Sequence, residues 1–309
     1  MEQDEKVFEY FLEMEPKNRM MVIDSMQPDD RCRFTRCSKQ FDSEVKSSKN
    51  YVHSLSIFCS PVFTTIRVVH GIIDNRPYGF MLNFLKEDGN NVMLYTSFIN
   101  ERNLLIDLDS SKQLLQCAVE EFRRRMKICQ GSLKKLHIEG HFLTNVDLRI
   151  GNLPNLKELK VHGDFDILQL LSKLSQPLEK LIIMKEANSE LLKNCEQIYQ
   201  VEQYLEWQNA NFDYQQVQRL TTKNLVTSIG KLTEFDLFKI IRTWQNGTIG
   251  KEIGTFRFLN ISNFNKIKIL RFLRISDDQT TRFEIKHYHK AGKSAQLWLA
   301  ADFIRFDSL

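Results

Sequence analysis

The chain has little of what marks several protein classes. It has only 6 cysteines in 309 residues and no Cys-x-x-Cys pair, so we expect reduced thiols rather than a disulfide framework. No apolar run approaches the roughly 18 residues of a membrane span, and the N-terminus is acidic where a secretory signal is basic. The net charge is only +4, below the clustered basic charge typical of nucleic-acid binding. We therefore predict a cytoplasmic and/or nuclear protein with no membrane or nucleic-acid partner.

The common catalytic motifs are also missing from the sequence. There is no G-x-G-x-x-G, P-loop, G-x-S-x-G or H-E-x-x-H motif, and these carry most cofactor and hydrolase chemistry. His137 and His141 have the spacing of two ligands on a helix, but His137 lies in a predicted strand, where that spacing does not converge. We expect no catalytic residue, no cofactor and no metal site, and therefore not an enzyme.

What is present is the composition of a folded protein, with 42% hydrophobic and 27% charged residues. Residues 6–48 have apolar positions at helical spacing, and Pro16 and Pro28 divide them into three expected short helices. Apolar runs of strand length follow at 62–69, 80–85 and 92–98, with a hairpin connection expected at 88–91. A helix with one apolar face is expected from Leu114 to Met126.

A repeat is the clearest internal order. The pattern Leu-x-x-Leu-x-(Ile/Val) begins at Leu133, Leu156 and Leu178, at spacings of 23 and 22 residues, which fall in the leucine-rich repeat range. A helical return is expected at 164–175 and a helical connecting region at 188–219. Thr233 and Asp236 have the spacing of a capping box for a further helix, and a final hairpin is expected over 283–299.

The outward positions of these repeats favour a basic surface. They are Lys135, His137, Lys157, Lys160 and Lys180. Such a face would suit an acidic target, but alternating lysines also protect exposed strands from aggregation. Both interpretations remain open from the sequence.

The N-terminal stretch resembles an F-box. The matching segments are 14–16, 22–23, Met26, 28–31, Phe34 and 36–41. They follow the F-box order of a Pro near the start, an apolar pair, a Pro-x-Asp turn and a Cys-Ser ending near Lys and an aromatic, although Glu15 replaces the usual leucine. The C-terminal third is similar to the F-box-associated domain of the large nematode F-box families, through 220–225, 232–237, 244–247, 283–286 and 292–297.

Together these features predict an α+β fold, with a small N-terminal helical F-box module followed by an α/β leucine-rich-repeat-like domain. The expected domains are 1–48, the F-box-like module; 49–200, with degenerate repeats at 133–186; and 201–309, an F-box-associated domain either separate from the repeats or continuous with them. About 40 helical residues bury too little surface to be stable alone, so we expect a partner to complete the first module.

The resemblance implies that this partner is a Skp-family adaptor, which links to a cullin. The expected adaptor-binding or supporting residues are Pro16, Met20, Val22, Ile23, Met26, Cys32, Phe34 and Cys37. The alternative for these side chains is that they form the module's own core. The resemblance therefore implies a non-catalytic substrate-recognition subunit of an SCF-type ubiquitin ligase, with an unknown protein target. The alternative function is a leucine-rich-like scaffold that does not engage the adaptor.

Overall fold

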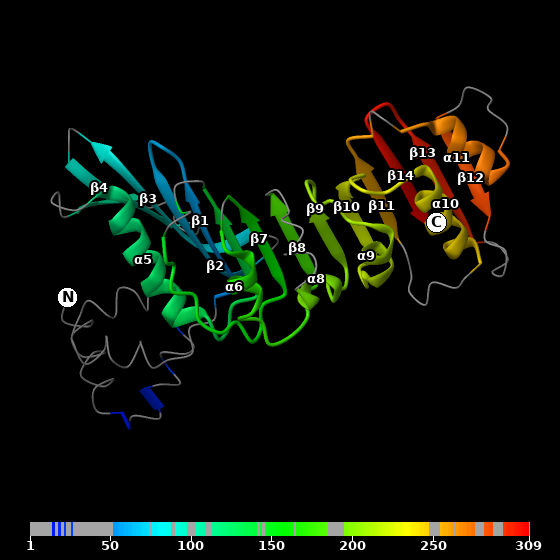
Figure 1. Cartoon of the computed structure of the whole chain (residues 1–309). Coiled ribbons are helices and arrows are strands. Elements are labelled where there is room, and N and C mark those ends of the chain that lie inside the picture. The colour runs from blue at the N-terminus through cyan, green and yellow to red at the C-terminus, as the bar shows by residue number, and fades with distance from the viewer. Residues whose placement is uncertain are drawn as a thin grey trace. The chain divides into compact units, whose positions relative to one another are not determined.

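The computed structural model of the chain is mainly β (Figure 1). It describes residues 14–15, 18–19, 22, 26, 52–73, 76–87, 90–97, 103–108, 113–140, 143, 146–163, 165–184, 195–246, 254–261, 264–275, 281–286 and 293–308. These contain fourteen strands of a mixed sheet and six mostly short helices. The expected α+β fold with an α/β repeat domain is therefore wrong. The expected helical module at 1–48 lies almost entirely outside the described residues.

The chain divides into two compact units. Unit 1 comprises Met1–His137 and Val146–Asn155, and unit 2 comprises Ile138–Asn145 and Leu156–Leu309. The division falls within strand β6 (Lys135–Glu139). The domain boundaries expected at 48 and 200 remain predictions.

Unit 1 is built from antiparallel neighbours. Its strands are β1 (Ser54–Cys59), β2 (Thr64–Ile73), β3 (Arg76–Glu87), β4 (Asn90–Ser97) and β5 (Asn103–Asp107). Each strand pairs with the next one along the chain. Glu87 lies opposite Asn90, which confirms the hairpin expected at 88–91. At Gly79 the backbone has φ +156° and a Cβ atom would lie 2.0 Å from the Val68 carbonyl oxygen, so this close approach requires glycine.

One helix covers the sheet of unit 1. Helix α5 (Leu114–Cys129) confirms the expected helix and packs against β1, β2 and β3. Its buried side chains are Ala118, Val119, Phe122, Met126 and Cys129. They recur three or four residues apart and so form one apolar stripe. Against it lie the alternating buried residues of the strands, such as Ile57, Ile66 and Leu82.

Unit 2 begins as a series of parallel strands. These are β7 (Glu158–His162), β8 (Lys180–Met184), β9 (Tyr204–Trp207), β10 (Asn224–Ser228) and β11 (Thr255–Leu259). They start 22, 24, 20 and 31 residues apart. Antiparallel strands then continue the sheet beyond β11 in the order β14 (Phe303–Ser308), β13 (Ser294–Leu299) and β12 (Arg282–Lys286). Pairing of β12 with β13 confirms the expected final hairpin.

Between the strands of unit 2 the chain returns through short helices. These are α6 (Ile167–Leu171), α8 (Glu196–Tyr199), α9 (Tyr214–Arg219), α10 (Glu234–Gln245) and α11 (Lys266–Leu273). The first three have only four to six residues, because a repeat of 20 to 24 residues must also hold a strand and two loops. This shortness explains why the α/β expectation fails. The expected helical region at 188–219 contains the two short helices α8 and α9, with strand β9 between them.

Matching side chains stack from strand to strand in unit 2. Leu159, Leu181, Leu205, Leu225 and Phe256 are successive Cα partners across the five parallel strands. All are at most 2% exposed, and burying each such side chain stabilises the fold by about 1.5–3 kcal/mol. The repeat predicted at β7 and β8 therefore continues through β11.

Candidate functional site

The strands of unit 2 have one covered face and one exposed face. Along each parallel strand, buried side chains alternate with half-exposed ones, and the helices α6, α8 and α9 follow one another along one side (Figure 1). We call the other side the open face. Its side chains are Glu158, Lys160, His162, Lys180, Ile182, Met184, Tyr204, Glu206, Asn224, Val226, Thr255, Arg257, Leu259, Phe303, Arg305, Asp307, Gln296, Trp298, Arg282, Glu284 and Lys286.

Acidic partners offset the lysines at the β7–β8 end. Lys157 forms an ion pair with Glu179, and Lys180 Nζ lies 3.2 Å from Glu158 Oε1. His162 Nδ1 lies 3.3 Å from Glu139 Oε1. Two of the lysines expected to make this surface basic, Lys157 and Lys180, therefore have glutamates beside them, and the expectation of a basic surface as a whole stays a prediction. Exposed pairs of this kind contribute about 0–1 kcal/mol each, so they neutralise the surface more than they stabilise it.

A polar network fixes the middle of the open face. Tyr204 Oη donates to Glu206 Oε2 at 2.8 Å, and Gln208 Nε2 donates to Glu206 Oε1 at 2.7 Å. Burial, together with the hydrogen bond and charge of Glu206, raises the pKa of Tyr204 to about 12. The phenol is therefore protonated at physiological pH and holds the carboxylate in place.

A cavity of about 580 Å³ opens where the parallel strands β9, β10 and β11 end. Its walls come from the three loops that follow these strands. The lining residues are Asn209, Asn211, Ser228, Ile229, Gly230, Leu232, Thr233, Glu234, Asn260, Ile261 and Phe264. The carboxyl ends of parallel strands are a common place for ligands. The wall is mostly amide, hydroxyl and backbone groups, which suits a polar group rather than an apolar one.

Close backbone contacts shape this cavity. Gly230 has φ +54°, and a Cβ atom there would lie 2.7 Å from Asn211 Cα, so two loops approach more closely than other residues allow. Asn260 also has positive φ, and its Nδ2 donates to Ser228 Oγ at 3.2 Å. Backbone N–H groups, including that of Asn265, lower the pKa of Glu234, so this wall residue is a carboxylate at neutral pH.

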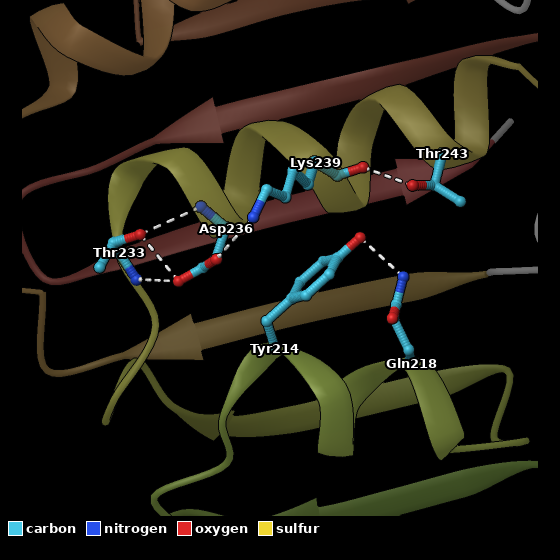
Figure 2. A network of polar contacts seen from close by, with 6 residues as sticks. All are labelled: Tyr214, Gln218, Thr233, Asp236, Lys239 and Thr243. Atoms are coloured by element: carbon cyan, nitrogen blue, oxygen red, sulfur yellow. Dashed lines mark hydrogen bonds and ion pairs between the residues drawn. The ribbon is translucent and has the colours of Figure 1, made fainter.

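The start of α10 borders the cavity and is firmly capped (Figure 2). Thr233 Oγ1 accepts a hydrogen bond from the Asp236 N–H at 3.2 Å, and the Thr233 N–H donates to Asp236 Oδ2 at 3.0 Å. This confirms the expected capping box. Lys239 Nζ lies 3.6 Å from Asp236 Oδ1 and 4.9 Å from the centroid of the Tyr214 ring. The contact connects α10 to α9, the helix of the preceding repeat.

Sequence reasoning missed the cavity because its residues lie on three separate loops. A usable signal exists in the extended repeat. Leu205-x-Trp207, Leu225-x-Thr227 and Phe256-x-Phe258 continue the strand pattern, and a polar residue follows each within two positions. Trp207 and Thr227 stand where the pattern has Ile or Val, so these repeats are not recognised from the sequence. The buried Thr227 hydroxyl is satisfied by donating to the Ala210 carbonyl at 3.1 Å.

Two of the expected adaptor-binding residues are described. Val22 and Met26 are half-buried, and the Met26 N–H donates to the Val22 carbonyl at 3.1 Å, the spacing of a helical turn. The other six, Pro16, Met20, Ile23, Cys32, Phe34 and Cys37, lie outside the described residues. The adaptor site therefore remains a prediction.

Three of the four described cysteines have the character of protonated thiols. Cys59, Cys129 and Cys195 are buried, and burial raises the pKa of Cys59 to about 11 and that of Cys129 to about 12. Burial also raises the pKa of Cys195. Thiolates are the reactive form, so these three side chains pack rather than react. Across the described ranges, no group of three or more His, Cys, Asp or Glu side chains could hold a metal ion.

No helix in the described part of the chain is long and apolar enough to cross a membrane. No protein-family model, curated protein or solved structure matches the chain.

Proposed function

We propose that this chain is a non-catalytic substrate-recognition subunit of an SCF-type cullin ubiquitin ligase. In this proposal residues 1–48 bind a Skp-family adaptor, and unit 2 binds a protein target. The observation that supports target binding by unit 2 is the open face. It presents the half-exposed side chains of five parallel strands in register. At about 4.8 Å per strand this row spans about 19 Å, enough to hold a folded or extended protein segment.

The chemistry of the open face supports a protein target over a small substrate. It mixes apolar side chains such as Ile182 and Val226 with hydrogen-bonding ones such as Tyr204 and Asn224. Protein interfaces have this composition, with an apolar centre and a polar surround. Repeat architectures use their regular faces in the same way, because each added strand extends the binding surface.

The adaptor-binding half rests on the sequence pattern of residues 14–41. The direct test is a pull-down of the full chain with a purified Skp-family adaptor. We expect the wild type to bind and a variant carrying Ile23→Asp and Met26→Asp to lose binding, because burying an unpaired carboxylate in an apolar interface is unfavourable. Val62→Asp is the matched control, since Val62 is 76% exposed in unit 1, and it should bind like the wild type.

Two outcomes separate this function from its alternative. Binding that the double variant loses and the control retains supports the receptor function. A wild-type chain that folds cooperatively but does not bind the adaptor contradicts it and favours a scaffold. Circular dichroism and thermal unfolding of all three proteins would show that each is folded before binding is compared.

A further inference from the structure

Strand β5 in unit 1 is an edge strand with an exposed apolar centre. Among the described residues, the strand order ends with β5 on one side and with β12 on the other. Leu104 is 44% exposed and Leu105 is 51% exposed. Successive side chains of a strand point to opposite faces of the sheet, so both faces of β5 are open to solvent at its centre.

The two edge strands differ in how they are protected. The exposed residues of β12 are Arg282, Glu284 and Lys286, and the two residues between them are buried. Charged side chains on an edge strand discourage pairing with other chains. In β5 the exposed centre consists of two leucines, and the single charged residue, Asp107, stands at the end of the strand. The β5 edge therefore lacks the protection that the β12 edge has.

The hydrogen bonds of β5 show which of its backbone groups are available. Just after the strand, the Leu108 N–H donates to the Asn91 carbonyl at 2.9 Å. Residues of an antiparallel strand alternate between facing one neighbour and facing the other, so the backbone groups of Leu104 and Ile106 also face β4. The backbone groups that point away from β4 are those of Asn103, Leu105 and Asp107. They form an edge to which a further strand can be added.

A second copy of β5 fits this edge when it runs antiparallel and is centred on Leu105. Leu105 then lies opposite Leu105 of the other copy, and Asn103 lies opposite Asp107. These are hydrogen-bonded positions, so the pairing supplies about six backbone hydrogen bonds. Within one chain Asn103 Oδ1 accepts from Thr96 Oγ1 at 2.9 Å, which leaves Asn103 Nδ2 to donate to the Asp107 carboxylate of the other copy. No like charges lie directly opposite in this register, where they would repel.

The apolar layer beneath α5 continues into the same arrangement. Leu82, Tyr95 and Leu104 are successive cross-strand partners and so lie on one face of the sheet. Leu82 is 1% exposed in the layer that α5 covers, so Leu104 extends that layer to the edge. In the paired arrangement, Leu104 of each copy lies opposite Ile106 of the other. These are non-hydrogen-bonded positions, where side chains are closest, so pairing covers apolar surface that a single copy exposes.

We propose that β5 is a self-association surface, through which two copies of this chain pair edge to edge as a symmetric dimer. Two-fold symmetry is the commonest arrangement of homo-oligomers, and it uses the same residues of both copies. Pairing of two five-residue strands buries less than the about 800 Å² per partner of a standard interface, so we expect a weak dimer that forms at micromolar concentrations. The inference goes beyond the proposed function and applies equally to the alternative scaffold.

The test is sedimentation equilibrium of the full chain at concentrations from about 1 to about 200 μM, the range in which an interface of this size associates. We expect the mean mass to rise from that of the monomer toward that of the dimer and no further, because pairing occupies the β5 edge of both copies. A wild type that stays monomeric at the highest concentration would overturn the inference and would leave the edge to a segment of a different protein. Growth beyond the dimer would overturn it as well.

A proline at the centre of β5 tests whether the edge itself forms the contact. Leu105→Pro removes an N–H that points away from β4 and leaves the hydrogen bonds to β4 in place. It should weaken dimerisation by about tenfold or more. Leu105→Thr is the matched control, since it shortens the same side chain but keeps the N–H and the preference for a strand. The control should weaken dimerisation by less than about threefold. Equal losses in the two variants would contradict edge pairing.

Two variants of Asn103 test the register. Asn103→Lys places a cation opposite Asp107 of the other copy, at two positions in each dimer, and should tighten dimerisation by about twofold to tenfold. Asn103→Asp places carboxylates opposite each other and should weaken it by a similar factor. Both effects should shrink in high salt. Asn103 is exposed, so both variants should unfold cooperatively like the wild type. Shifts in the same direction for the two variants would overturn the inference, even if Leu105→Pro fails to fold.

Discussion

Unit 1 and unit 2 both bury one face of a sheet under helices, but the helices differ in number and in length. In unit 1 one helix of 16 residues covers three antiparallel strands. In unit 2 each of the first parallel strands has its own return segment, with helices of four to six residues. Stability therefore depends on one amphipathic element in unit 1 and on repeated local contacts in unit 2. A repeat can carry binding residues on any strand without changing the packing of the others.

The largest expected effect is truncation of the single helix in unit 1. Phe122 is fully buried at the centre of α5, and we expect Phe122→Ala to lower the free energy of unfolding by about 3–5 kcal/mol. Because α5 packs on three strands, hydrogen exchange should accelerate in β1, β2 and β3 together. Urea unfolding and exchange mass spectrometry would measure both effects. The exposed neighbour Gln116→Ala is the control and should cost less than about 0.5 kcal/mol.

A truncation in one repeat of unit 2 should be more local. Leu181 is 0% exposed between Leu159 and Leu205, so Leu181→Ala should cost about 2–4 kcal/mol. Exchange should rise mainly in β7, β8 and β9, since each repeat contacts its neighbours. Ile182→Ala, on the open face of the same strand, should cost about 1 kcal/mol. If hydrogen exchange accelerated equally in all strands through β14, unit 2 would unfold as one cooperative unit, and the contrast with unit 1 would be removed.

The same contrast explains how much the sequence predicted. The hairpin at 88–91 and the stripe on α5 are local patterns of turn residues and helical spacing, and both were found. In unit 2, Leu159 and Leu181 match the repeat pattern, so β7 and β8 could be predicted. Trp207 and Thr227 depart from the pattern, so β9 and β10 could not. Their side chains fit the stack through an edge-to-face contact of Trp207 with Phe212 and a hydrogen bond of the Thr227 hydroxyl. These compensations arise from tertiary packing, which a repeat pattern does not contain.

The candidate sites were harder to predict than the fold. The capping box of α10 follows from a single segment, and the structure confirms it. The cavity requires three loops that are separated in the sequence, and no local pattern brings those loops together. Two of the lysines that the sequence suggested, Lys157 and Lys180, lie beside Glu179 and Glu158, and this pairing depends on the register of β7 and β8.

The smallest expected effect concerns how the helices of the two units begin. Among the described residues, Gln113 at the start of α5 makes no side-chain capping hydrogen bond, whereas α10 has a complete capping box. Burial opposes ionisation of Asp236, but hydrogen bonds from Thr233 and the charge of Lys239 outweigh it and lower the pKa of this carboxyl. A carboxyl whose pKa is lower in the folded state adds stability above its unfolded pKa, and this stability is lost as the pH falls through the folded value.

Asp236→Asn keeps an acceptor for the Thr233 N–H but removes the charge at the start of the helix. We expect it to lower the free energy of unfolding by about 0.5 kcal/mol at neutral pH, in the range of charge effects near a helix N-terminus. The difference from the wild type should begin to shrink as the pH falls below about 4, the pKa of the unfolded carboxyl, and should vanish only below the lowered pKa of the folded carboxyl, where the folded wild type is protonated as well. Urea unfolding across this pH range would measure it, with the exposed Asp302→Asn as the control. If the difference in the free energy of unfolding were the same at every pH, the effect would come from the hydrogen bond alone. The charge of Asp236 would then contribute nothing to the stability of α10.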